Sequence, residues 1–165
     1  MRFLRFVMLL SLAVWIGALI FFPVVAQTSF SVLPSTHLAG LVVRDSLLKL
    51  HWMAFVSGLV FLVTSLVYNR RLIGRAHVFG LNHPGLSHVL IVSMLTLTAF
   101  SQFRIIPRMD TLRASAREIA TRPSDDPIRQ QFDSLHAWST RLEGTVLILG
   151  MIVLYSTASR FNSQR

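Results

Sequence analysis

The chain has 165 residues, of which 53% are hydrophobic and only 14% are charged. Soluble domains carry about 25% charged residues, so this composition favours an integral membrane protein over a globular one. The formal net charge is +9, and there is no cysteine, which excludes disulfides, iron–sulfur clusters and thiolate zinc sites. The excess arginines flank apolar runs and do not form a separate basic patch, so no nucleic-acid partner is expected.

Four apolar runs fill most of the chain, and each is about as long as a membrane is thick. A hydrocarbon core of about 30 Å takes about 20 helical residues to cross. We therefore predict an all-α fold, an integral membrane four-helix bundle that forms a single domain over residues 1–165. The predicted helices cover 4–30, 35–68, 86–122 with a kink at Pro107, and 127–159.

The first two helices are predicted to be long. The apolar run from Phe6 to Ala26 exceeds the 7–15 residues of a signal-peptide core, so it is read as a membrane helix. Pro34-Ser35-Thr36 is a helix-start signal, and no helix breaker follows until Asn69. The second helix would then be about 50 Å long at 1.5 Å per residue, so its outer end is expected to protrude from the membrane.

The third and fourth helices repeat this pattern. Pro107 is expected to kink the third helix without ending it, because Met109, Leu112, Ala116 and Ile119 keep a three-to-four spacing beyond it. Ser124-Asp125-Asp126 followed by Pro127 supplies an acidic cap and a proline at the first helical position. The fourth helix is therefore predicted to begin at residue 127.

Unopposed arginines predict the orientation. They occur in the N-terminus at Arg2 and Arg5, in the second loop at Arg70, Arg71 and Arg75, and in the tail at Arg160 and Arg165, with no acidic residue among them. By the positive-inside rule, both termini are expected in the cytoplasm and the protein in a bacterial inner membrane, as a multi-pass protein. The first and third loops, with the protruding helix ends, would then lie on the periplasmic side.

Three predicted helices bring polar side chains to a similar depth near their outer ends. The residues are His51, Gln102, Arg104, His136, Ser139 and Glu143. Each is costly alone in a membrane, so the first interpretation is an interhelical hydrogen-bond cluster in which Arg104 pairs with Glu143. Spacings of three, four and seven place His136, Ser139 and Glu143 on one helical face.

Two other interpretations of these residues stay open. His51 and His136 on facing helices match the axial ligands of a b-type haem, and Met53 would help them to hold copper. The same groups would also serve as a proton or anion path. The absence of a bound cofactor is favoured over haem or copper. The sequence contains no glycine-rich phosphate loop and no serine-centred nucleophile motif, so no enzymatic activity is predicted.

Several segments resemble a known family. They are Trp15-Ile16-Gly17 with Phe21-Phe22-Pro23-Val24-Val25, the stretch Gln102-Phe103-Arg104-Ile105-Ile106-Pro107-Arg108, and Phe132-x-x-Leu135-His136-x-x-Ser139. The chain is similar in these segments to the transmembrane-protein-205-like family, whose bacterial members are known as domain of unknown function 4149. This resemblance implies a four-helix membrane protein without an established reaction.

Together, these features predict a structural or accessory subunit of a membrane complex. Its partners would be the lipid bilayer and other membrane-protein subunits or further copies of the chain itself. The alternatives are a membrane haem or metal protein centred on His51 and His136, and a small-solute permease. Four helices without an internal repeat make a permease the weaker of the two.

Overall fold

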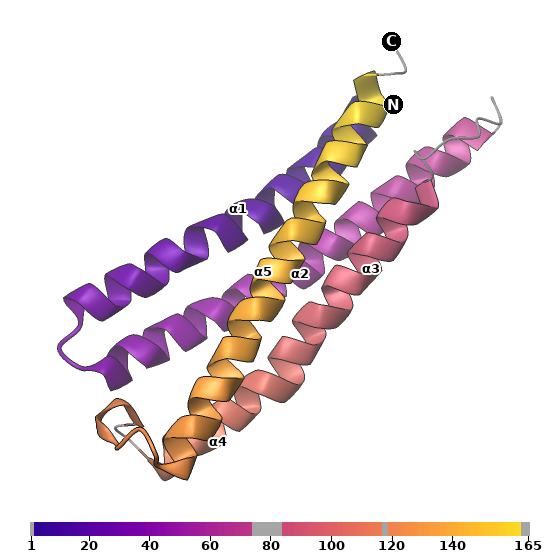
Figure 1. The fold of residues 1–165 in the computed structure, drawn as a ribbon. Helices are drawn as coiled ribbons and strands as arrows, with labels where there is room; N and C mark the ends of the chain where they lie inside the picture. Colours follow the sequence, from indigo (N-terminus) through magenta and orange to yellow (C-terminus); the bar gives the residue numbers. More distant parts are fainter. Residues whose placement is uncertain (1, 74–83, 117–118, 163–165) are drawn as a thin grey trace.

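The computed structural model describes residues 2–73, 84–116 and 119–162, and in these ranges the chain is helical with no strand. Figure 1 shows the helices in chain order. They are α1 (Arg2–Val32), α2 (Thr36–Ile73), α3 (Pro84–Phe100), the π turn η1 (Ser101–Ile105), α4 (Ile106–Ser115), the 3-10 turn η2 (Ile119–Thr121) and α5 (Pro127–Asn162). The all-α prediction is confirmed, with four long apolar helices.

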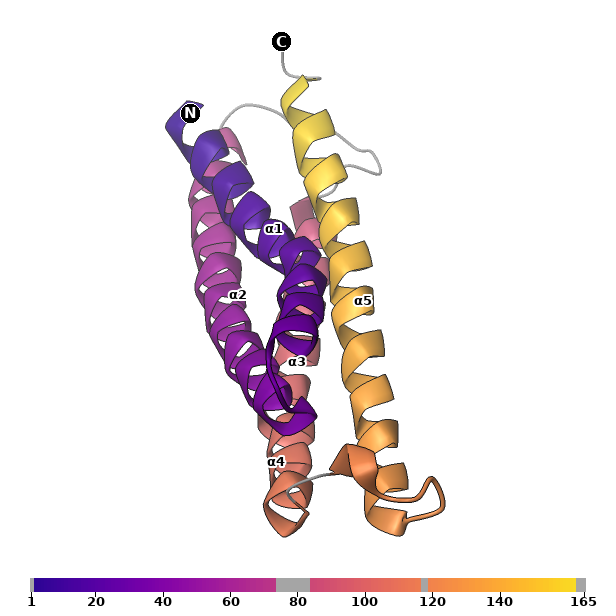
Figure 2. The same ribbon diagram turned by 90° about the vertical axis from the view of Figure 1, so that its left-hand side faces the viewer.

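The helices form two hairpins, α1 with α2, and α3–η1–α4 with α5. The start of α1 and the end of α5 lie at the same end of the molecule (Figures 1 and 2), and the two hairpins diverge toward the opposite end (Figure 1). We call the end with the termini the terminal half and the diverging end the splayed half. The second loop is only partly described, and Arg75 lies outside the described residues.

The helix starts lie where the sequence places them. Ser35 precedes α2, and its Oγ accepts a hydrogen bond of 3.1 Å from the Leu38 N–H. Asp126 precedes α5, and its Oδ1 accepts from the Ile128 N–H at 2.8 Å and the Arg129 N–H at 3.2 Å. Both residues therefore act as N-caps that satisfy amide groups without a partner inside the helix.

The third helix differs from its prediction in two places. Its irregular turn, η1, precedes Pro107, and the Ile106 N–H donates to the Ser101 carbonyl five residues back. The helix then ends at Ser115 and not at residue 122, because Ala116 takes an extended backbone with φ −147° and ψ 95°. Ala116 and Ile119 are both buried.

A tightly packed core fills the terminal half. Its largest fully buried side chains come from all four long helices, and they include Trp15, Phe61, Met94 and Val153. Glycines let the helices approach closely in this half. A Cβ atom on Gly58 would lie 2.7 Å from Leu95 Cδ2 and 3.0 Å from Trp15.

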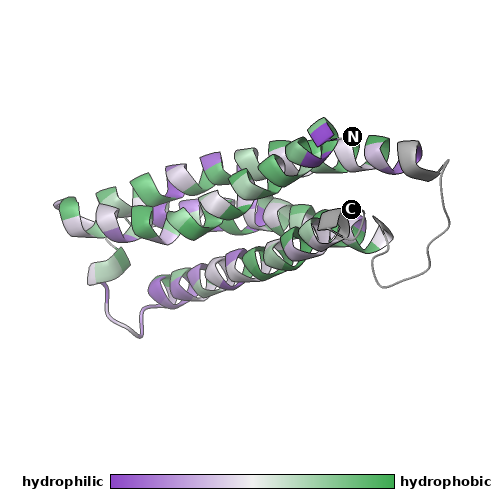
Figure 3. Cartoon of the chain, turned by 90° about the horizontal axis from the view of Figure 1, so that it is seen from above, coloured by the Kyte–Doolittle hydropathy of each residue, from purple (hydrophilic) through white to green (hydrophobic). Residues whose placement is uncertain are grey.

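Four helical stretches are long and apolar enough to cross a membrane: Arg2–Val32, Thr36–Arg70, Gly85–Ser115 and Pro127–Ser159. Their outward faces expose large apolar side chains such as Phe21, Val56 and Ile148. α5 changes from hydrophilic residues near its start to hydrophobic residues in its second half (Figure 3). The architecture is that of a multi-pass membrane protein.

Candidate functional site

A buried polar triad lies where the terminal half meets the splayed half. His51 of α2 is fully buried, and its Nδ1 lies 2.7 Å from Oε1 of Gln102 in η1. Its Nε2 lies 2.8 Å from Oε1 of Glu143 in α5. One imidazole thus connects both hairpins, and both of its ring nitrogens are engaged.

With the side-chain oxygen of Gln102 toward His51, two arrangements of protons satisfy this triad. In the first, His51 is neutral with its proton on Nδ1, and a protonated Glu143 donates its O–H to Nε2. In the second, His51 is an imidazolium that donates to both Gln102 and the Glu143 carboxylate. Neither arrangement carries a net charge, which keeps the cost of burial low. They differ only in which atom of the 2.8 Å contact holds the proton.

Gln102 lies in the π turn, and its side chain faces His51. An α-helix bonds four residues back and a π turn five, so the extra residue rotates the following helix by about 100°. Ser101, Gln102 and Ile105 within the turn are all buried, as is Ile106 after it. π turns inside α-helices are frequent at functional sites. Here the turn lies beside Pro107, which has no N–H to donate to a regular helix.

A cavity of about 680 Å³ opens beside the triad, between the diverging hairpins. This is within the range of about 300–1,000 Å³ that is typical of small-molecule sites. Its interior is mainly apolar, with Phe22, Phe30, Leu47, Ile106 and Leu147 in its lining. Ile119 and Ala120 of the returning chain also line it. The early end of the third helix therefore shapes the cavity.

Polar residues line the cavity as well. They are Thr36, His37, Arg44, Arg113, Arg129, Asp133, His136, Ser139, Thr140 and Glu143. Glu143 is the member of the triad that reaches the cavity, and its side chain is 14% exposed. Its second carboxylate oxygen, Oε2, is buried and has no hydrogen-bond partner. A carboxylate oxygen in this position is an acceptor without a donor.

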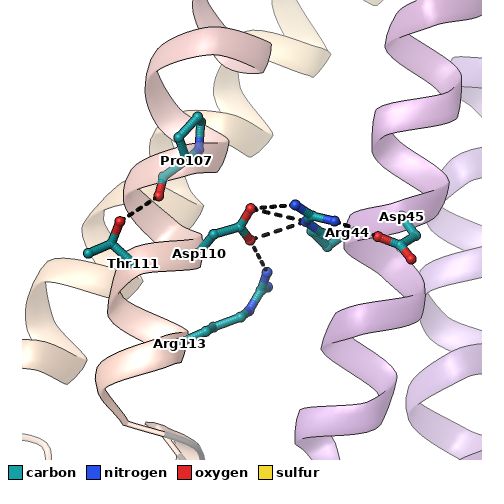
Figure 4. A network of polar contacts seen from close by, with 6 residues as sticks. All are labelled: Arg44, Asp45, Pro107, Asp110, Thr111 and Arg113. Atoms are coloured by element: carbon teal, nitrogen blue, oxygen red, sulfur yellow. Dashed lines mark hydrogen bonds and ion pairs between the residues drawn. The ribbon is translucent and has the colours of Figure 1, made fainter.

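The arginines of the cavity have partners of their own. Arg44 of α2 binds Asp110 of α4 through two nitrogens, with Nη2 at 2.7 Å and Nε at 3.1 Å from Oδ2 (Figure 4). Arg113 lies 3.5 Å from the same carboxylate, and its guanidinium lies 5.1 Å from the centre of the Phe132 ring. Arg129 Nε lies 3.8 Å from Asp133. The Arg44–Asp110 pair joins α2 to α4 in the splayed half.

The predicted polar cluster is partly different from the observed one. Gln102 and Glu143 both bond His51, and Ser139 is buried in the cavity lining. The predicted Arg104–Glu143 pair is wrong, because Arg104 lies exposed on the outer face of the π turn and Glu143 Oε1 bonds His51. His136 is exposed on the cavity lining and does not take part in the triad.

The haem and copper interpretations do not fit this geometry. An imidazole binds a metal through the lone pair of a ring nitrogen. Both ring nitrogens of His51 are engaged, with Gln102 at 2.7 Å and Glu143 at 2.8 Å. Among the described residues, no group of three His, Asp or Glu side chains is placed to hold a metal ion.

Sequence reasoning missed three features: the cavity, the Arg44–Asp110 pair and the π turn. Pro107 is the signal in the sequence for irregular backbone, although it predicts only a kink and not the π turn. Asp110 and Arg113 are three residues apart on a predicted helix, which already placed them on one face.

Comparison with known families now bears on this geometry. The sequence profile described as "Domain of unknown function (DUF4149)" matches residues 10–118. The chain belongs to this family. The matched region contains His51 and Gln102 and ends before α5, so Glu143 lies beyond it. No curated protein and no solved structure matches the chain.

Proposed function

We propose that this DUF4149 protein binds a small amphipathic molecule in the cavity between its hairpins. The cavity of about 680 Å³ is the observation that carries this proposal. Its apolar lining suits a hydrocarbon or aromatic group, and the triad suits a polar end. A molecule that partitions into the bilayer has both parts.

Binding is favoured over passage through the protein. In the described part of the chain, the terminal half is filled by fully buried side chains, among them Trp15, Phe61 and Val146. The cavity lining contains Leu19 and Leu147, which belong to or pack against this core, but none of these three side chains. A permease would need a second opening through these residues.

The location is part of the proposal. We place the protein in a bacterial inner membrane with both termini in the cytoplasm, because Arg2, Arg5 and Arg70 lie near one end without nearby acids. The splayed half and its cavity would then face the periplasm. Reporter fusions at residues 165 and 124 test this orientation, and periplasmic activity of the fusion at 165 would contradict it.

An accessory role in a membrane complex is the second candidate. The divergence of the hairpins favours it, because the splayed half offers an open surface to a helix of another subunit or of a second copy. We also propose that the chain is related to the wider transmembrane-protein-205-like family. Copurification from solubilised native membranes tests for such a partner, which would depend on the splayed half.

A filled cavity is the direct test of ligand binding. Gly144 lines the cavity, and a Cβ atom there would meet nothing within 4 Å, so Gly144→Leu occupies the cavity without a clash. Gly17→Leu is the matched control, because Gly17 also has open space around it but lies on an exposed face outside the cavity.

The probes are four compounds with one phenylbutyl group and different ends: an amine, a trimethylammonium, an alcohol and a carboxylate. We call them the phenylbutyl panel. Binding is measured by equilibrium dialysis against protein in phosphatidylcholine nanodiscs, with empty nanodiscs to subtract partitioning. We expect saturable binding of at least one probe that Gly144→Leu abolishes and Gly17→Leu retains. Equal binding to both variants, or no saturable binding at all, would overturn the proposed function.

A further inference from the structure

The oxygen of Glu143 that has no hydrogen-bond partner indicates which polar group a ligand in the cavity would carry. Five buried side-chain atoms of the described residues have no hydrogen-bond partner: Trp15 Nε1, Thr98 Oγ1, Ser101 Oγ, Glu143 Oε2 and Thr157 Oγ1. Of these residues, only Glu143 lines the cavity. In both proton arrangements of the triad, the shared proton lies at Oε1, so Oε2 is an acceptor in either case.

The other charged groups of the lining do not compete for this role. Arg44 and Arg113 share Asp110, and Arg129 lies beside Asp133. These guanidinium groups already have carboxylate partners, so an anionic ligand finds no free cation among them. A ligand that donates to Oε2 satisfies the one buried group of the lining that lacks a partner.

The net charge of the triad bears on whether the ligand group that donates to Oε2 is neutral or cationic. With a bound ammonium and an imidazolium, the triad would hold a net charge of about +1 next to the apolar core, which is costly. Loss of the shared proton restores neutrality, since an ammonium then faces one carboxylate. Gln102 permits this change, because rotation of its amide lets it donate to Nδ1 while His51 Nε2–H donates to Glu143.

We propose that the cavity takes an amphipathic organic cation whose N–H donates to Glu143 Oε2, and that the cation replaces the proton shared by His51 and Glu143. The proton leaves to solvent, so one positive charge enters as one departs. This inference rests on the proposed function and names its ligand class. The phenylbutyl panel tests it, because the amine, with an alkylammonium like that of lysine, is charged at neutral pH.

We expect the amine to bind about tenfold tighter than the alcohol, the trimethylammonium to fall between them, and the carboxylate to bind weakest. The trimethylammonium keeps the charge but has no N–H to donate. Glu143→Gln should remove the advantage of the amine and leave the alcohol unchanged. Asp125→Asn is the control and should retain the order, because Asp125 is exposed and lies outside the cavity lining.

The pH profile tests the exchange itself. His51 of α2 bonds Glu143, and Gln102 of η1, which bonds His51, is neutral. The other titratable or charged groups of the cavity lining are His37 and Arg44 of α2, Arg113 of α4, and Arg129, Asp133 and His136 of α5. The lining from α1 is apolar apart from its backbone. In a background of His37→Gln with His136→Gln, amine affinity should rise as the pH rises, because fewer protons compete with the ammonium for Glu143, while alcohol affinity stays level.

The outcomes separate the two proposals. Saturable binding in which the alcohol or the carboxylate equals the amine overturns the cation inference and leaves the proposed function standing. A flat pH profile for the amine in the double-histidine background overturns the exchange of cation for proton. Absence of saturable binding by every probe overturns the proposed function. The order of the panel on the unmodified protein does not depend on whether Glu143→Gln folds.

Discussion

The terminal and splayed halves are built from the same helices but packed in opposite ways. Gly150 of α5 lies against the core, where a Cβ atom would come within 3.1 Å of Ile16 and Met94. Gly144, six residues earlier on the same helix, faces open cavity. Membrane helices gain little from burying apolar groups away from lipid, so close contact at small residues holds the terminal half together.

The splayed half depends instead on polar contacts. The His51 triad marks its inner boundary, and the Arg44–Asp110 pair joins the hairpins farther out. This division leaves room for a ligand without loosening the core. It also predicts which substitutions are severe in each half.

The largest loss of stability should come from replacing His51, which marks the inner boundary of the splayed half. His51→Leu leaves Gln102 and Glu143 without their shared partner in a buried site, which should lower the free energy of unfolding by about 3–5 kcal/mol. Thermal unfolding in detergent measures this change. Arg104→Ala is the control, because Arg104 is exposed, and it should stay within about 0.5 kcal/mol. Equal stability of the two variants would show that the triad does not join the hairpins.

The next effect concerns the core of the terminal half. Gly58→Ala places a Cβ atom 2.7 Å from Leu95 and 3.0 Å from Trp15, so Leu95 must shift, at a cost of about 1–3 kcal/mol. Gly144→Ala should be neutral or stabilising by up to about 1 kcal/mol, since alanine favours the helix. Comparison of the two melting temperatures checks the contrast. A stabilising Gly58→Ala would mean that the terminal half is as open as the splayed half.

The helices could be predicted from the sequence because each apolar run is about as long as a membrane is thick. It also placed the helix starts at Ser35 and Asp126, since capping chemistry is local. It grouped Gln102 with Glu143 because polar groups at one depth in a membrane need partners. These inferences need only spacing along one helix and the cost of burying polar groups.

The exact partners and the cavity depend on information that spacing does not contain. Spacing alone does not tell which residue of a neighbouring helix each polar group meets: Gln102 bonds His51, whereas Arg104 is exposed. The cavity arises from the angle between two hairpins, which is a property of their packing. The return of the chain after Ser115 likewise depends on what Ile119 contacts.

A smaller loss of stability should follow from breaking the Arg44–Asp110 pair. Asp110→Ala removes the carboxylate that binds Arg44 and Arg113, and the side chains of Arg44 and Asp110 are each about one-third exposed. We expect a loss of about 1 kcal/mol, because the pair is bidentate but partly solvated. Asp45→Ala is the control, since Asp45 is 61% exposed and binds Arg44 within the same helix. Urea or thermal unfolding of the two variants distinguishes a joint between hairpins from a surface ion pair.

The smallest effect lies at the tip of the splayed half, where Asp126 caps α5. Partial desolvation acts to raise the pKa of Asp126, but the N–H groups of Arg129 and Ile128 and the Arg122 guanidinium outweigh it and hold the pKa below its ordinary value of 3.8. The carboxylate is thus favoured in the folded state, and its contribution is fully present above the unfolded pKa.

The contribution of Asp126 should be lost as the pH falls below 3.8 and through the lowered pKa of the folded state. Asp126→Asn keeps a capping oxygen that does not titrate, so the melting temperature of the unmodified protein should approach that of the variant in acid. Ser124→Ala, which removes no titratable group, should show a constant difference from the unmodified protein. A constant difference for Asp126→Asn as well would mean that the cap carries no charge-dependent stability, and that the tip does not rely on polar contacts as the rest of the splayed half does.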